Sequence, residues 1–108
     1  MRKPLQKNEF LLQFEELLKK YGYDTVYCRG DFDGTKKKGL DFTIVAPRNT
    51  EVNKEFNMLL DPTWNVEDVE AEDITALVIC PVQEEAIPRM GVPIYQEGEF
   101  YAVEGSNN

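Results

Sequence analysis

Histidine is absent from the 108 residues of this chain, and cysteine occurs only twice. The lack of histidine excludes the commonest general base, the Ser-His-Asp and Cys-His nucleophile systems and the usual nitrogen ligand of zinc. Two isolated cysteines cannot hold a structural zinc ion, and they are too few for a disulfide scaffold. Neither kind of glycine-rich phosphate loop is present. Carboxylates, lysines and tyrosines are therefore the groups left for catalysis.

Long apolar runs are also missing, because none approaches the ~20 residues that a membrane helix needs. The basic start at Met1 is followed by polar residues rather than by the apolar stretch of a secretory signal. We therefore expect a cytoplasmic protein without membrane contact, whose two thiols are reduced. Cys28 and Cys80 fall in strand-like segments, where a cysteine is most often a small buried hydrophobe. A disulfide between them is the alternative if those strands are adjacent.

Positive charge is scarce in the second half of the chain. Residues 1–54 hold 11 Lys/Arg and 8 Asp/Glu, whereas residues 55–108 hold one basic residue, Arg89, and 12 acidic ones. This asymmetry, within a net charge of −8, indicates opposed surface fields and argues against direct nucleic-acid binding by the acidic half. Residues 66–73 form the densest acidic stretch. Solubility alone is the competing explanation for these charges.

The composition is that of a globular chain, with 42% hydrophobic and 11% aromatic residues. We expect one domain over residues 1–108, with only residues 1–7 and 104–108 frayed. The longest apolar run, at 74–80, is rich in β-branched residues and predicts a strand buried on both faces. The connection over 63–73 is predicted to be irregular or a short helix.

Two helices are predicted from periodic apolar residues and their end signals. The first runs from an N-cap at Asn8 to Tyr21, with Gly22 as its stop. Leu12 points away from the apolar stripe of this helix. The second, shorter helix begins at Asn49 or Thr50 and ends after Leu60, before Asp61 and Pro62.

Strands are predicted at 23–28 and 40–46, joined as a hairpin by a long basic tip. A tight hairpin of 94–96 and 99–103 turns at Glu97-Gly98, and 83–93 is predicted to be a loop. Together these elements predict an α+β fold: a mostly antiparallel sheet of about five strands with the first helix packed on one face.

Residues Phe14–Asp24 (FEELLKKYGYD) and Gly39–Phe42 (GLDF) resemble the opening of restriction-endonuclease-like domains of the PD-(D/E)XK type, especially the Mrr-like branch. The resemblance spans about residues 14–45. It implies that Asp41 would be the first magnesium ligand, with helix carboxylates such as Glu9 or Glu16 nearby. The family also uses a second acidic residue and a lysine, spaced E-x-K on the next strand, which this sequence does not supply. The resemblance therefore favours a nuclease-like scaffold without nuclease activity.

The acidic stretch is a candidate docking face. Carboxylates crowded without a cation repel one another, so a basic partner binds them favourably. Aromatic residues adjoin the stretch in sequence, and aromatic anchors rimmed by charge are typical of protein interfaces. For the acidic stretch, a solvated surface or a metal site is the alternative, and for the aromatic residues the alternative is a purely core role. The candidate protein-binding residues are Trp64, Glu67, Asp68, Glu70, Glu72, Asp73, Tyr95 and Phe100.

These features predict a small acidic binding protein that is not an enzyme and uses no cofactor or metal. By analogy of size and charge, it would be an inhibitor or an immunity or anti-defence protein of a phage or mobile element. Its partner would be a basic, nucleic-acid-handling protein. Two alternatives stay open: a divergent magnesium nuclease using Asp41, and a homodimeric structural subunit pairing through Leu12 and the C-terminal hairpin.

Overall fold

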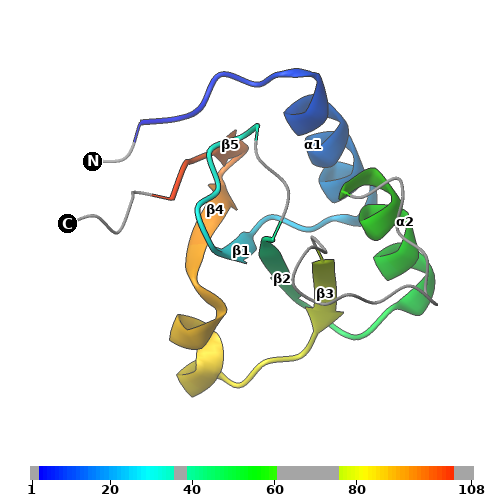
Figure 1. Cartoon of the computed structure of the whole chain (residues 1–108). Helices are drawn as coiled ribbons and strands as arrows, with labels where there is room; N and C mark the ends of the chain where they lie inside the picture. The colour runs from blue at the N-terminus through cyan, green and yellow to red at the C-terminus, as the bar shows by residue number, and fades with distance from the viewer. Residues whose placement is uncertain (1–2, 36–38, 61–75, 104–108) are drawn as a thin grey trace.

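The chain forms a five-stranded mixed sheet with two α-helices and a short 3-10 helix (Figure 1). The computed structural model describes residues 3–35, 39–60 and 76–103, so the predictions for 63–73 and 104–108 lie outside the described residues. The strand order is β3-β2-β1-β4-β5; β2 and β3 are parallel and the other neighbours are antiparallel. The predicted α+β class and mostly antiparallel sheet are confirmed. The elements are α1 (Glu9–Tyr21), β1 (Val26–Arg29), β2 (Asp41–Val45), α2 (Thr50–Leu60), β3 (Ala76–Cys80), η1 (Glu84–Met90), β4 (Val92–Gln96) and β5 (Glu99–Phe100).

Both predicted ends of α1 are confirmed. The backbone N–H of Leu11 donates to Asn8 Oδ1 at 2.8 Å, which satisfies one of the free donors of the first turn. Gly22 ends the helix in the left-handed conformation, with φ of 78°. The helix buries Leu11, Phe14 and Leu18 among others, while Leu12 points outward and is 52% exposed.

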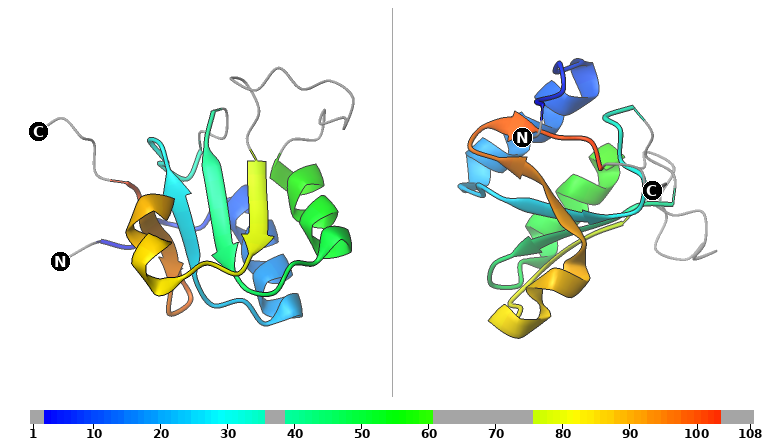
Figure 2. Two further views of the ribbon diagram at one scale, coloured as in Figure 1. Left: turned by 90° about the horizontal axis from the view of Figure 1, so that it is seen from below. Right: turned by 90° about the vertical axis from the view of Figure 1, so that its left-hand side faces the viewer.

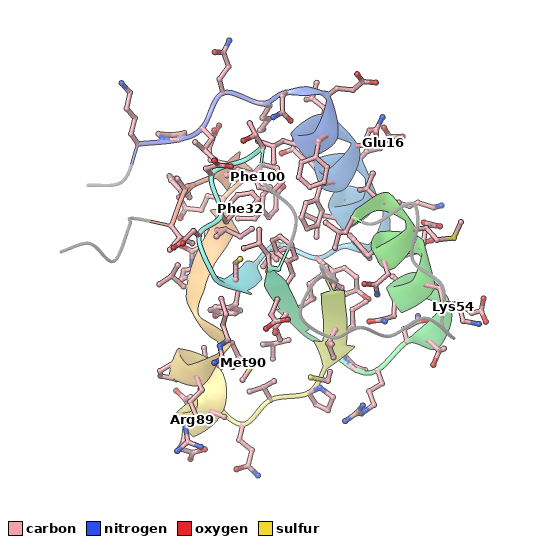
Figure 3. All side chains as sticks on the ribbon, viewed as in Figure 1. Glu16, Phe32, Lys54, Arg89, Met90 and Phe100 are labelled. Carbon is pink, nitrogen blue, oxygen red and sulfur yellow. The ribbon has the colours of Figure 1, made fainter. Side chains whose placement is uncertain are left out.

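Both helices cover the same face of the sheet (Figure 2). Side chains of successive strand residues point to opposite faces, and those of Phe42 and Ile44 are buried beneath the helices. On the opposite face Val45 and Val78 are 36% and 46% exposed, so this part of the sheet is bare. Figure 3 shows Phe32 and Phe100 turned into the core, whereas Glu16, Lys54 and Arg89 point outward.

The prediction that the apolar run at 74–80 is buried on both faces is wrong. Its described part is β3, which lies at the edge of the sheet with only β2 beside it. Leu77 and Ile79 are buried, but Val78 faces away from the helices and is exposed. A β-branched residue suits the pleated surface of a strand even on its solvent side, so the apolar run did not show which face was covered.

Side-chain amides from α2 cover the free edge of β3. Asn57 Nδ2 donates to the carbonyl of Leu77 at 3.0 Å, and the N–H of Leu77 donates to Asn57 Oδ1 at 2.9 Å. The N–H of Ile79 donates to Asn53 Oδ1 at 3.1 Å. The helix therefore supplies hydrogen bonds that another strand would otherwise supply, and it closes this edge to strand addition.

The N-terminal segment closes the other edge of the sheet. The N–H of Leu5 donates to the carbonyl of Phe100 at 2.8 Å, and the Lys7 ammonium donates to the carbonyl of Gly98 at 2.7 Å. These are the outward-facing carbonyls of the β4–β5 hairpin. Within the segment 1–7 that was predicted to fray, Leu5 and Lys7 are held by these backbone and side-chain hydrogen bonds.

The C-terminal hairpin is confirmed, with a two-residue turn at Glu97 and Gly98, whose φ angles are 52° and 79°. Strand β5 ends at Phe100, earlier than predicted. The predicted loop at 83–93 contains η1, which lies at the end of the molecule remote from α1 (Figure 1).

The two cysteines are free thiols, and a disulfide between them is excluded by the sheet order. Cys28 is in β1 and Cys80 in β3, with β2 between them. Cys28 turns to the helix side, whereas Cys80 shares the bare face with Val78. Burial, with a smaller contribution from the charge of Asp41, raises the pKa of Cys28 to about 12.

Replacement of Asn57 tests the closed edge. We expect Asn57→Ala to lower the free energy of unfolding by about 1–3 kcal/mol, because the N–H and carbonyl of Leu77 lose their partner. Met58→Ala is the matched control, since Met58 is the next residue of α2 and is 66% exposed. Urea unfolding followed by circular dichroism measures both. Equal midpoints for the two variants would contradict the role of Asn57.

The thiols should react at different rates. Because a thiolate is the reactive form, we expect a disulfide reagent at pH about 8 to label Cys80 while Cys28 stays protected in the folded chain. Cys80→Ser should therefore remove the labelling seen under native conditions, and unfolding in urea should restore one reactive thiol. Rapid native labelling of Cys28 in that variant would show that β1 is not covered as described.

Candidate binding site

Two of the predicted contact residues are in the core. Tyr95 and Phe100 are 3% and 0% exposed, and their ring centroids are 4.7 Å apart. The hairpin packs this aromatic pair against α1, where the ring centroids of Phe100 and Phe14 are 5.6 Å apart. The expectation that they anchor a partner at the surface is therefore wrong, because packing already covers both rings. The other predicted residues lie outside the described part of the chain: Trp64, Glu67, Asp68, Glu70, Glu72 and Asp73.

The carboxylates named by the nuclease resemblance do not lie together. Asp41 is exposed at the start of β2 and shares the bare face of the sheet with Val45. Glu9 and Glu16 are exposed on α1, which covers the opposite face. Within residues 3–35, 39–60 and 76–103, no three His, Cys, Asp or Glu side chains are grouped closely enough to hold a metal ion.

A partly buried ion pair joins the N-terminal segment to α1 and β4. The Lys7 ammonium lies 3.0 and 2.9 Å from the two carboxylate oxygens of Glu15, and the Tyr95 hydroxyl donates to Oε2 at 3.1 Å. Burial raises the pKa of Glu15, but the hydrogen bonds from Lys7 and Tyr95 outweigh it, so that the pKa is lower than usual. Burial, together with the charge of Glu15, raises the pKa of Tyr95 to about 12. Lys7, Glu15 and Tyr95 satisfy one another's hydrogen bonds, which indicates a structural role.

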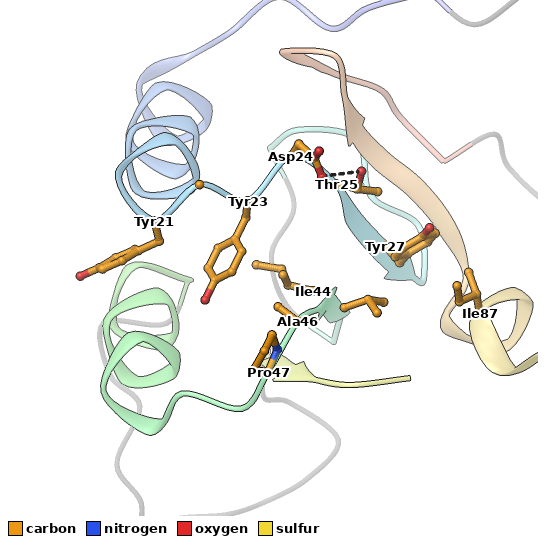
Figure 4. Close-up of a pocket in the computed structure, with 11 residues that line it drawn as sticks. Tyr21, Tyr23, Asp24, Thr25, Tyr27, Ile44, Ala46, Pro47 and Ile87 are labelled. Carbon is orange, nitrogen blue, oxygen red and sulfur yellow. Dashed lines mark hydrogen bonds between the residues drawn. The ribbon is translucent and has the colours of Figure 1, made fainter. Parts of the chain in front are cut away.

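A pocket of about 490 Å³ lies where the end of α1 meets the end of β2 (Figure 4). Tyr21 and Tyr23 lie on one side of it, and Tyr27 and Ile87 lie on the other. The apolar side chain of Ala46 lies between them. The other lining residues are Gly22, Asp24, Thr25, Ile44, Val45 and Pro47.

Local sequence explains why the tyrosines gather here. Gly22 takes the left-handed conformation, and the N–H of Tyr23 then donates to the carbonyl of Leu18 at 2.8 Å. This turn places the Tyr21 and Tyr23 ring centroids 6.4 Å apart. Tyr27 comes from the bare face of β1 and is half-buried. The end of α1, the link to β1 and β1 itself therefore each supply one partly exposed aromatic ring.

Among the described residues, Asp24 is the one charged residue that lines this pocket. It is exposed, and its Oδ1 accepts a hydrogen bond from Thr25 Oγ1 at 3.2 Å. The Tyr21 hydroxyl donates to the Glu55 carboxylate at 2.9 Å, and the ammonium of Lys20 is 3.6 Å from that carboxylate. Aromatic rings beside an unneutralised carboxylate suit a cation that also carries apolar surface.

Sequence reasoning did not find this pocket. It predicted Tyr21 as the last residue of the first helix, and it placed Tyr23 and Tyr27 in a strand. The available signal was three tyrosines within seven residues, arranged around a glycine that ends a helix. The lining residues from the end of β2 and from η1 could not be read from that segment.

Comparisons with models of known protein families, with curated proteins and with solved structures find no match to this chain. Neither α1 nor α2, nor any other helix in the described ranges, is long and apolar enough to cross a membrane. The function therefore has to be inferred from the charge and geometry of the chain itself.

The pH dependence of stability tests the ion pair of Lys7 and Glu15. Because the folded-state pKa of Glu15 is lower than its ordinary value of 4.5, its stabilising contribution is present above that pH and is lost as the pH falls through the folded pKa. We expect Glu15→Gln to be less stable than the native chain at pH about 7, with the difference shrinking below pH about 4.

Glu16→Gln is the matched control for this prediction, because Glu16 is the exposed neighbour on the same helix. The difference in urea midpoint from the native chain should change with pH for Glu15→Gln and stay constant for Glu16→Gln. A difference for Glu15→Gln that stays constant from neutral to acid pH would contradict the assignment of the charge to Glu15.

Proposed function

We propose that this chain is a non-catalytic protein-binding module whose partner is a basic protein. The charge distribution carries the proposal: residues 55–108 contain 12 acidic residues and one basic residue. Charges of one sign concentrated in this way attract a surface of the opposite sign, accelerate encounter and select against acidic competitors. The densest part, residues 66–73, is the main docking segment in this proposal.

The closed sheet edges restrict how such a partner can bind. Asn53 and Asn57 occupy the outward backbone groups of β3, while Leu5 and Lys7 occupy those of the β4–β5 hairpin. Addition of a partner strand would have to displace these bonds. Recognition through exposed side chains is therefore favoured over strand addition.

The partner class follows from the chemistry of the acidic surface. Nucleic-acid-handling proteins present clustered lysine and arginine, which neutralise phosphates. A strongly acidic chain can occupy such a surface in place of the nucleic acid. The proposed role is accordingly that of an inhibitor or an immunity or anti-defence protein acting in the cytoplasm. A magnesium nuclease centred on Asp41 has less support, because Glu9 and Glu16 lie across the sheet from it.

Capture from a cell lysate tests this proposal. The immobilised chain is compared with a variant in which Glu67, Asp68, Glu70, Glu72 and Asp73 are replaced by the corresponding amides. The control variant replaces five exposed carboxylates elsewhere, which changes the net charge equally: Glu9, Glu16, Asp31, Glu51 and Glu97.

We expect the native chain and the control to retain the same basic protein in stoichiometric amount at low salt, and less of it at moderate salt. The variant of the acidic stretch should retain at least tenfold less. Equal retention by that variant, or the same loss in the control, would contradict a docking role for residues 66–73.

A further inference from the structure

We infer that the tyrosine-lined pocket receives an arginine side chain of the basic partner, an inference that rests on the proposed function. The pocket has a volume of about 490 Å³, within the range of about 300–1,000 Å³ typical of ligand sites. Tyr21, Tyr23 and Tyr27 are each half-buried, so their rings are fixed by packing and still accessible from solvent. A long side chain can therefore enter between them.

The charges around the pocket favour a cationic ligand. Asp24 is the one charged residue among the described lining residues, and no described residue forms an ion pair with its carboxylate. Arg48 follows Pro47 in the sequence but does not line the pocket. A cation entering the site therefore meets a carboxylate and aromatic faces, and none of the described lining residues is positively charged.

One of these rings already contacts a cation of the chain itself. The ammonium of Lys20 lies 5.1 Å from the centroid of the Tyr21 ring, within the range of a cation–π contact. Lys20 is at the same time paired with Glu55 at 3.6 Å. In this internal contact a cation lies against a tyrosine ring and is also paired with a carboxylate. We infer that the arginine of the partner is held in the same way, by the rings of Tyr23 and Tyr27 and the carboxylate of Asp24.

Arginine suits the pocket better than lysine. Its guanidinium is flat, so it can stack on a tyrosine ring and still donate hydrogen bonds in its own plane to a carboxylate. The Oδ1 of Asp24 accepts a hydrogen bond from Thr25, and its second oxygen has no partner among the described residues. The ammonium of lysine is a compact, strongly hydrated charge and gains less from an apolar wall such as Ile87.

Titration of the full-length chain with short peptides tests this inference. Four capped pentapeptides carry arginine, lysine, citrulline or proline at the centre of otherwise identical glycine and serine residues. Binding is followed by the NMR shifts of the backbone amides at residues 22–27 and 44–46. We expect saturable shifts with the arginine peptide, at least threefold weaker binding of the lysine peptide, and no saturation with citrulline, which lacks the charge.

Variants identify the site. Asp24→Asn and Tyr27→Leu should each lower the affinity for the arginine peptide at least fivefold. Asp31→Asn, at an exposed aspartate outside the pocket, should leave that affinity unchanged. Circular dichroism verifies that each variant is folded. The inference would be overturned if the arginine and citrulline peptides bound equally, if the proline peptide bound more tightly than the arginine peptide, or if Asp24→Asn kept full affinity for the arginine peptide.

The lysate capture separates this inference from the proposed function. A partner that requires residues 66–73 but binds Asp24→Asn and Tyr27→Leu as tightly as the native chain would refute the pocket and leave the proposed function intact. If no partner is captured, the proposed function fails, while the peptide titration still decides whether the pocket binds arginine. Loss of the captured partner in both pocket variants would support the two together.

Discussion

The packing around Phe14 is the interaction on which the rest of the structure depends. Its side chain is fully buried, and its ring centroid lies 5.7 Å from that of Phe42 in β2, 5.9 Å from that of Phe56 in α2 and 5.6 Å from that of Phe100 in β5. A single side chain of α1 therefore joins both helices to two strands of the sheet. Offset and edge-on contacts of this kind add to the apolar area that the rings bury. The position of α1 in turn places its last residue, Tyr21, at the pocket.

The parts of the fold that could be predicted are those set by local chemistry. Asn8 and Gly22 define the ends of α1 through bonds within a few residues, and Glu97-Gly98 suits a two-residue hairpin turn. Neighbours in space could not be predicted in the same way. The apolar pattern of β3 does not reveal that it is an edge strand, and nothing near Asn57 in the sequence indicates its bonds to Leu77.

The candidate site shows the same limit. Charge asymmetry is visible in the sequence because it needs only a count, but the roles of individual aromatic residues depend on packing. Tyr95 and Phe100 look like surface anchors when they are judged by their acidic neighbours, yet both complete the core around α1. Tyr23 and Tyr27 look like ordinary strand residues, and they become pocket residues only when Ala46 and Ile87 are brought beside them from distant segments.

In the function that we propose, recognition is divided between two properties of the chain. The acidic half supplies long-range attraction, which governs encounter more than specificity of contact. The pocket supplies a fixed aromatic wall and one carboxylate, which can select a particular side chain. Since side-chain hydrogen bonds close one edge of the sheet and backbone and side-chain hydrogen bonds close the other, neither property requires the sheet to open.

Hydrogen exchange of the full chain, alone and saturated with its captured partner, tests this account most directly. The account predicts slower amide exchange in the complex at residues 22–27, at 44–46 and within the acidic stretch, with the outer surfaces of both helices unchanged. Protection confined to the helix surfaces around Leu12 and Met58, with the pocket and the acidic stretch exchanging as in the free chain, would contradict it.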